Sequence, residues 1–186
     1  MDLITLLQQR ASCPLVVEPG PTAQQLAEMF RAACRAPDHG NLKPWRFLVV
    51  EGAAREKLGE LFLRAALAKE PQLVEPLQAK MHKMPLRAPT LVVVIARLQP
   101  HPKVPALEQQ LAAGAAAQNI LLAAHAMDLG AMWRTGEMAY NPVVSRGLGL
   151  DENEQIIGFI YLGSRPDKER KVAPLDASAF VQHWNG

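Results

Sequence analysis

The segment from Ala106 to Leu129 constrains the fold of this 186-residue chain more than any other feature. Its hydrophobic pattern predicts a long helix, and half of the residues from Leu111 to Ala126 are alanine. A helix that carries small or apolar side chains on all sides is buried on all sides, and small side chains let another backbone come close. The enclosing surface comes either from the same chain or from a second subunit, and the pattern leaves both open. Gly130 is the expected left-handed residue after the helix end.

The composition excludes several classes of protein. Apolar residues make up 49% of the chain and charged residues 20%, with a formal net charge of +2. This near-neutral balance disfavours nucleic acid or an anionic membrane surface as a partner. No apolar run approaches the length of a membrane span, no secretory signal is present, and two cysteines form no disulfide framework. We therefore expect a single cytoplasmic domain over residues 1–186.

Hydrophobic periodicity predicts a sequence of helices and strands that alternate imperfectly. Helices are expected over 2–9, 22–35, 53–69 and 106–129, with a helical turn over 142–147; strands are expected over 46–51, 91–96, 131–134 and 155–163. The proline-rich stretch 70–89 predicts a loose helical excursion and a candidate lid. Because the tail ends in Phe180 and Trp184, we expect it to dock on a surface. The pattern is that of an α+β or α/β domain.

Three local clusters are the candidates for a binding site, because the chain lacks the common catalytic and nucleotide-binding signatures. The chain has no phosphate P-loop, dinucleotide glycine fingerprint, serine-hydrolase elbow or zinc spacing, and neither cysteine lies in a nucleophile signature. The clusters are Arg10-Ala11-Ser12, the run from Arg35 to Trp45, and Trp133-Arg134-Thr135-Gly136. Arginine beside serine or threonine suits a phosphate, so the three clusters together suggest one small anionic ligand. Taken singly, they also fit a helix C-terminus, a turn, and a core aromatic beside a surface charge.

The order of these clusters resembles the nitroreductase family of FMN-dependent oxidoreductases, most closely its short bacterial NAD(P)H nitroreductases. The motifs that carry the resemblance are Arg10-Ala11-Ser12 after the first helix, Ala36-Pro37-Asp38-His39-Gly40-Asn41-Leu42-Lys43-Pro44-Trp45, the alanine-rich helix, Trp133-Arg134-Thr135-Gly136, and Tyr161-Leu162-Gly163. The chain departs from the family pattern at Ala11, where a second arginine is usual, and at Lys43, which replaces a glutamine. The first departure removes one cation from the phosphate, a loss that Arg134 would offset.

The resemblance implies a fold and a two-subunit cofactor site. The fold would be a central, mostly antiparallel sheet flanked by helices, in an intertwined homodimer with FMN at the interface. Arg10, Ala11 and Ser12 would hold the FMN phosphate and ribityl chain, and Trp133, Arg134 and Thr135 would close on the same phosphate. Arg35 and His39 would come from the other subunit, and the tail would cross onto the partner.

The resemblance also implies the reaction. NAD(P)H would reduce FMN, and the reduced flavin would pass electrons to a small acceptor such as a nitroaromatic or quinone in a ping-pong sequence. Because the flavin carries the chemistry, no side chain is assigned as the catalytic acid or base, although His39 is a candidate proton donor. No metal is expected. Two alternatives remain: an FMN-binding storage or sensing protein without efficient turnover, and a non-flavin interaction protein.

Overall fold

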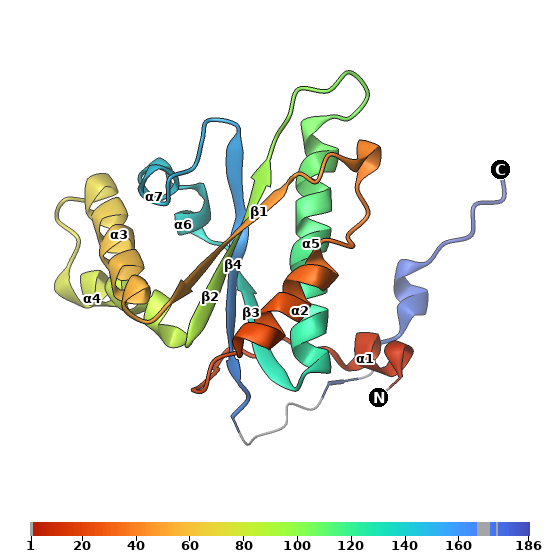
Figure 1. Cartoon of the computed structure of the whole chain (residues 1–186), viewed down its shortest axis with the longest axis horizontal. Coiled ribbons are helices and arrows are strands. Elements are labelled where there is room, and N and C mark those ends of the chain that lie inside the picture. Colours follow the sequence, from red (N-terminus) through yellow and green to blue (C-terminus); the bar gives the residue numbers. More distant parts are fainter. Residues whose placement is uncertain (1, 167–171, 174) are drawn as a thin grey trace.

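The core of the protein is a four-stranded sheet between two layers of helices (Figure 1). The computed structural model describes residues 2–166, 172–173 and 175–186. The strands are β1 (Trp45–Glu51), β2 (Thr90–Arg97), β3 (Leu129–Arg134) and β4 (Glu154–Ser164). Their order is β1-β2-β4-β3, and every neighbouring pair is antiparallel. The α+β class and the antiparallel sheet flanked by helices are therefore confirmed, and each predicted strand lies within an observed one.

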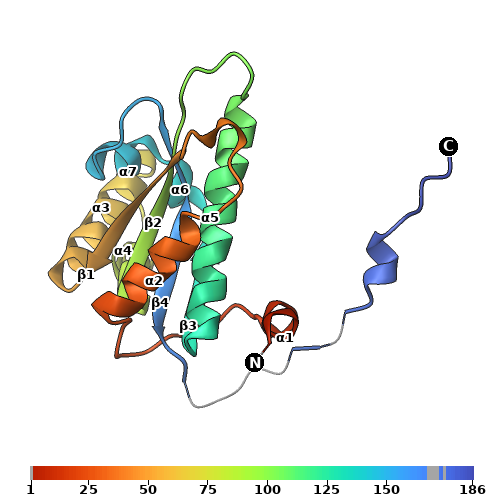
Figure 2. The ribbon, with the colours of Figure 1, turned by 45° about the vertical axis from the view of Figure 1, so that its right-hand side comes forward.

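The position of β2 inside the sheet, with both faces covered, explains why its sequence is apolar without alternation. Leu91, Val93 and Ile95 belong to the hydrophobic core on one face of the sheet, whereas Val92 and Val94 belong to the core on the other. A strand covered on both faces needs apolar side chains at every position. The first face is covered by α3 (Ala53–Lys69), α4 (Glu75–Lys83), α6 (Glu137–Tyr140) and α7 (Pro142–Gly147). The second is covered by α2 (Ala23–Ala33) and α5 (Ala106–Ala126) (Figure 2).

The first two helices begin directly after residues whose side chains cap them. Asp2 accepts hydrogen bonds from the N–H groups of Ile4 and Thr5 at the start of α1 (Leu3–Gln9). Thr22 and Gln25 form both halves of a capping box at the start of α2. Three short 3₁₀ turns complete the described elements: η1 (His39–Asn41), η2 (Pro85–Arg87) and η3 (Ala177–Phe180). Within the described residues, the helices are all too short or too polar to cross a membrane.

The stretch 70–89 is more regular than its prolines predict. It contains α4, which packs closely on α3. Gly59 permits this approach, because a Cβ atom at that position would lie 2.2 Å from the carbonyl oxygen of His82. Met81 and Met84 are partly buried against the same core. The helical excursion is therefore confirmed, but its expected looseness is wrong: α4 packs on α3, and these contacts do not suggest a lid.

The end of the long helix also differs from the prediction. The helix ends at Ala126, and Asp128, with φ of 57°, takes the left-handed position that was assigned to Gly130. Gly130 lies inside β3, where a Cβ atom would come within 2.7 Å of Val16 Cγ1. This glycine is needed for the close approach of the segment before α2 rather than for a helix cap, and aspartate tolerates the left-handed conformation better than most residues.

One side of α5 is not covered by its own chain. Leu107 and Leu111 are each 63% exposed, and Gly114, Gln118 and Leu122 further along the same side are only half-buried. The tail likewise extends away from the body in Figures 1 and 2, with Phe180 75% and Trp184 91% exposed. In the single chain, one side of this apolar helix is therefore exposed to solvent. The aromatic tail does not dock on its own chain.

A buried carboxylate connects the ends of three strands, at the end of the sheet that is distant from α1. The side chain of Glu154 is 1% exposed and accepts hydrogen bonds from Arg46 Nε at 2.9 Å and from the backbone N–H of Asp151 at 3.2 Å. Arg97 Nε lies 3.1 Å from the same carboxylate. The bonds from Arg46 hold the pKa of Glu154 below its usual range, although burial acts in the opposite direction.

Replacing Glu154 with glutamine is expected to lower the free energy of unfolding by about 2 kcal/mol at neutral pH, because two arginines lose their charged partner. A carboxylate whose pKa is lowered by folding stabilises the fold above its unfolded pKa, and this contribution disappears as the pH falls through the folded pKa. The difference between the parent and Glu154→Gln, measured by urea unfolding, should therefore shrink in acid. Glu28→Gln, which alters an exposed pair with Arg31, is the control. Equal effects of the two substitutions at neutral pH would contradict this assignment.

Candidate functional site

The segment after α1 is fixed along the β3 end of the sheet. Arg10 is the C-cap residue directly after α1, with its N–H bonded to the carbonyl of Leu6. The N–H of Cys13 donates to Ala131 O at 2.8 Å, and Val17 and Ser164 exchange two backbone hydrogen bonds at 3.0 and 2.8 Å. These bonds hold Arg10, Ala11 and Ser12, all of them half-buried, beside the strand that leads to Trp133.

Arg134 brings a second predicted cluster to the same place. Its Nη2 donates to the carbonyl of Pro14 at 3.2 Å, and its guanidinium carbon lies 5.4 Å from the centre of the Tyr161 ring. Burial raises the pKa of the Tyr161 phenol, so the ring beneath the cation stays neutral. Arg134 Nε is buried and has no hydrogen-bond partner among the described residues. An unpartnered buried donor beside a loop with another arginine is the chemistry expected of an anion site.

Trp133 is held against the backbone of β4. Its indole N–H donates to the carbonyl of Ile157 at 3.3 Å. Gly158 makes room for the ring, because a Cβ atom there would lie 2.1 Å from the indole nitrogen. Thr135 follows at the exposed end of β3, and Gly136 has a φ of 67°. Arg134 of the third predicted cluster thus lies beside the segment that carries the first cluster, whereas the Trp133 ring packs on the opposite face of the sheet, against α5.

The remaining cluster lies elsewhere in the chain. His39 Nδ1 is 2.5 Å from the Glu108 carboxylate at the start of α5, and both side chains are largely exposed. Arg35 is exposed just after α2. The backbone around them is a tight turn, in which Asp38 accepts a hydrogen bond from the N–H of Lys43 at 2.6 Å and Gly40, Asn41 and Lys43 have positive φ angles. The turn reading of this cluster is therefore confirmed for its backbone.

The two groups of residues lie at opposite ends of α5. Glu108 holds His39 at the N-terminal end, whereas Arg10 is close enough to His125, at the other end, to lower its pKa. The 17 positions between Glu108 and His125 correspond to about 26 Å along a helix axis. His39 therefore does not share a site with Arg10 of the same chain.

Arg165, directly after β4, is a cation that the sequence patterns did not single out. Its Nε donates to Leu129 O at 3.1 Å and its Nη2 donates to His125 O at 3.3 Å, so the side chain folds back over the end of α5. No motif marks Arg165. The available signal was a cation directly after a strand, at the edge that also carries the Arg10 segment.

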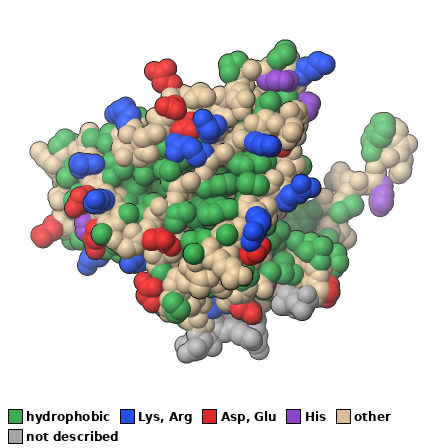
Figure 3. Space-filling view, viewed as in Figure 1, with side chains coloured by type: hydrophobic (Ala, Val, Ile, Leu, Met, Phe, Trp, Pro, Cys, Tyr) green, Lys and Arg blue, Asp and Glu red, His purple; other side chains and the backbone are tan. Residues whose placement is uncertain are grey.

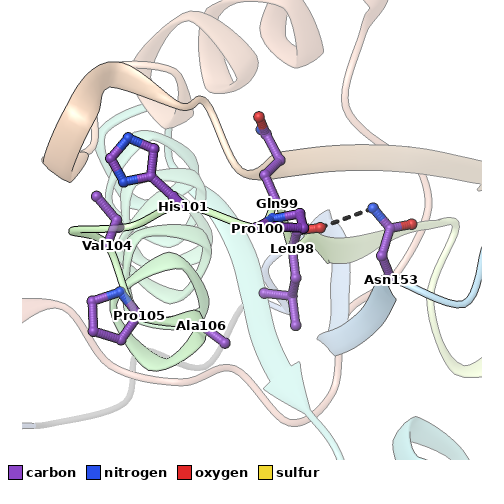
Figure 4. A pocket seen from close by; sticks show the side chains of 8 residues that line it. All are labelled: Leu98, Gln99, Pro100, His101, Val104, Pro105, Ala106 and Asn153. Atoms are coloured by element: carbon purple, nitrogen blue, oxygen red, sulfur yellow. Dashed lines mark hydrogen bonds between the residues drawn. The ribbon is translucent and has the colours of Figure 1, made fainter.

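A shallow cavity of about 420 Å³ lies between the loop after β2 and the start of α5 (Figure 4). It is lined by Leu98, Gln99, Pro100, His101, Val104, Pro105, Ala106 and Asn153. Asn153 Nδ2 donates to Leu98 O across one wall at 2.8 Å. The lining is mainly apolar, and the cavity lies at the His39 end of α5, away from Arg10 and Arg134. It is therefore separate from the basic cluster.

Most of this chain matches known proteins of one family. Residues 8–164 match the model of the Nitroreductase family. A relative in Escherichia coli (strain K12), named putative NAD(P)H nitroreductase YdjA, is 37% identical over 187 residues that cover 99% of this chain and 100% of the relative. These matches belong to oxidoreductases. The protein is a member of the nitroreductase family.

Solved structures show the same fold across the whole chain. The nitroreductase-like family protein from Bacillus cereus superposes with a TM-score of 0.84 at 24% identity, covering 100% of this chain and 97% of that one. A nitroreductase with bound FMN from Bacteroides fragilis NCTC 9343 gives a TM-score of 0.75 at 22% identity, covering 99% and 100%. The architecture predicted from the motifs is therefore that of the family.

Proposed function

We propose that the protein is an FMN-dependent oxidoreductase that takes hydride from NAD(P)H and reduces a small organic acceptor, such as a nitroaromatic or a quinone. Family membership, the NAD(P)H nitroreductase name of the Escherichia coli relative and the FMN in the Bacteroides fragilis structure support this proposal. The observation that carries it is the contact of Arg134 with Pro14, directly after the Arg10–Ser12 segment, together with a buried guanidinium nitrogen that has no partner among the described residues.

The donors at this site fit the phosphate and ribityl chain of FMN. Arg10 and Arg165 would supply the charge, Ser12 and Thr135 would supply hydroxyl groups, and Arg134 Nε would find an acceptor. Ala11 contributes backbone only, so the charge rests on fewer cations than in the family pattern. Trp133 would contribute through its backbone, because Gly158 and Ile157 fix its ring on the opposite face of the sheet from Arg134. FMN, when bound, supplies the hydride chemistry in alternating oxidation and reduction half-reactions.

We further propose that the working enzyme is a homodimer in which each cofactor site uses both chains. His39 lies about 26 Å along α5 from the Arg10 group, so His39, together with Arg35 just after α2, would serve the site of the partner. Three unburied apolar features support the dimer: the Leu107–Leu111 side of α5, the tail with Trp184, and the broad apolar area that crosses the middle of Figure 3. Exposed apolar surface of this extent is typical of a subunit interface.

An anaerobic absorption experiment tests the function. The protein is saturated with FMN, separated from free flavin, and titrated first with NADH and then with NADPH. We expect a yellow protein with about one FMN per chain, whose flavin band bleaches with at least one nucleotide and returns when nitroaromatic or quinone is added. Yellow protein that neither nucleotide bleaches would favour storage or sensing of FMN. Protein that binds no FMN would overturn the proposal.

A further inference from the structure

His125, near the end of α5, holds the guanidinium of Arg165. Arg165 Nη2 lies 2.5 Å from His125 Nδ1 and 3.3 Å from the carbonyl oxygen of the same residue. Arg165 Nε donates to Leu129 O at 3.1 Å. Three contacts from two adjacent turns of the chain leave the guanidinium one orientation, since its donors are fixed in a rigid plane.

The contact with Arg165 determines the protonation of the imidazole. A guanidinium only donates hydrogen bonds, so His125 Nδ1 must accept and the ring must be neutral, with its proton on Nε2. His125 Nε2 is buried and has no hydrogen-bond partner among the described residues. This buried N–H is not required for holding Arg165. The imidazole is therefore retained in an incompletely satisfied position, which points to a role for its Nδ1 acceptor.

The charges around His125 favour the same neutral form. Burial lowers the pKa of His125 below its ordinary value, Arg165 and Arg10 lower it further, and Asp128 acts in the opposite direction. These three charged groups come from the ends of β4 and α1 and from the turn after α5. Two cations, Arg10 and Arg165, thus flank one neutral ring at the site where the FMN phosphate is proposed to bind.

We propose that His125 is a positioning residue for the cofactor: its Nδ1 lone pair fixes Arg165 beside Arg10, so that two cations face one phosphate. This inference rests on the proposed function. It explains how a chain with Ala11 in place of an arginine keeps a second phosphate-binding cation, since Arg165 is supplied from the far end of β4 and oriented by the long helix.

Binding of FMN and riboflavin to the full-length protein tests this role, because riboflavin lacks the phosphate. His125→Leu keeps the bulk of the side chain and removes the acceptor; His125→Asn places an oxygen near the position of Nδ1. We expect His125→Leu to raise the Kd of FMN about tenfold, as for the loss of one charge-assisted hydrogen bond, and to leave riboflavin binding unchanged. His125→Asn should restore FMN binding to within about threefold of the parent. In an Arg165→Ala background, His125→Leu should have no further effect.

The outcomes separate this inference from the proposed function. An equal loss of FMN and riboflavin binding in His125→Leu, or a loss that persists in the Arg165→Ala background, would overturn the positioning role while leaving the flavoprotein intact. A parent protein that binds neither flavin would overturn the proposed function and this inference with it.

A pH series gives a second readout that does not depend on His125→Leu being folded. Protonation of the imidazole removes the acceptor, and because the pKa of His125 is lowered, the preference of the parent for FMN over riboflavin should fall as the pH drops below about 6.5, the ordinary pKa of histidine. The FMN phosphate loses charge over the same range in every variant, and His125→Asn corrects for this effect. The preference should fall more steeply in the parent than in His125→Asn. Parallel profiles would contradict the role assigned to the neutral ring.

Discussion

Replacement of Arg10 with alanine is expected to weaken FMN binding about one hundredfold, the largest effect of any single side chain in the cofactor site. Arg10 directly follows α1 and has no carboxylate partner among the described residues, so its charge is available to a ligand. The neighbouring Ala11 cannot compensate, and Arg134 already donates to Pro14 O and lies over Tyr161. Titration of the flavin-free protein with FMN, followed by the quenching of flavin fluorescence, measures the change.

Two further variants and a second ligand are the controls for Arg10→Ala. Arg10→Lys keeps the charge and loses the two-pronged geometry, so its affinity should lie between the parent and Arg10→Ala. Arg31→Ala removes an exposed arginine that pairs with Glu28 on α2, and FMN binding should not change. Riboflavin, which lacks the phosphate, should bind to all of these variants as tightly as to the parent. If Arg10→Ala and Arg134→Ala both retained FMN as tightly as the parent, the assigned phosphate site would be wrong.

The elements predicted best are those whose signal is local. The apolar run from Leu91 to Ala96 gives β2 because both faces of this strand are covered, and α3 spans the predicted residues 53–69. The Thr22–Gln25 capping box sets the start of α2 through two short-range hydrogen bonds. In each case the physical cause lies within a few residues of the pattern, and the sequence displays it directly.

The predictions that failed depend on contacts between distant segments. Gly130 reads as a helix cap, but its role is to let Val16 approach β3, and Asp128 makes the turn instead. Gly59 reads as an ordinary helical residue, although it admits the backbone of α4. Local rules of helix termination and proline content take no account of contacts with distant segments. They therefore misplace the end of α5 and predict too loose a structure for residues 70–89.

The candidate site was predicted in the same uneven way. The segment that follows Arg10–Ser12 is bonded to β3 and to Arg134, which agrees with the predicted neighbourhood of these two clusters. Arg165 was missed because it depends on His125, 40 positions earlier in the chain, and no spacing rule links them. The roles of the individual residues toward FMN, and the contribution of Arg35 and His39 to a partner site, remain predictions that the experiments above address.

Substitution of Leu111 with aspartate is expected to abolish the dimer and cofactor binding together. Leu111 is 63% exposed on the open side of α5, so the fold of the single chain does not depend on it. In the proposed interface, the carboxylate would be buried without a partner, at a cost of several kcal/mol. In the proposed dimer each cofactor site would use Arg35 and His39 from the other subunit, and hence FMN binding should fall when the chains separate. Light scattering gives the mass, and flavin absorbance gives the FMN content of the same fractions.

The control for Leu111→Asp is Leu77→Asp, which places the same charge at a 42% exposed leucine on α4, away from the open side of α5. This variant should remain dimeric and yellow. Circular dichroism of both variants verifies that the helices are intact. A dimeric Leu111→Asp protein would show that α5 is not the interface. A folded monomer that binds FMN as tightly as the parent would contradict the shared site, because one chain holds the Arg10 and His39 groups at opposite ends of a helix about 26 Å apart.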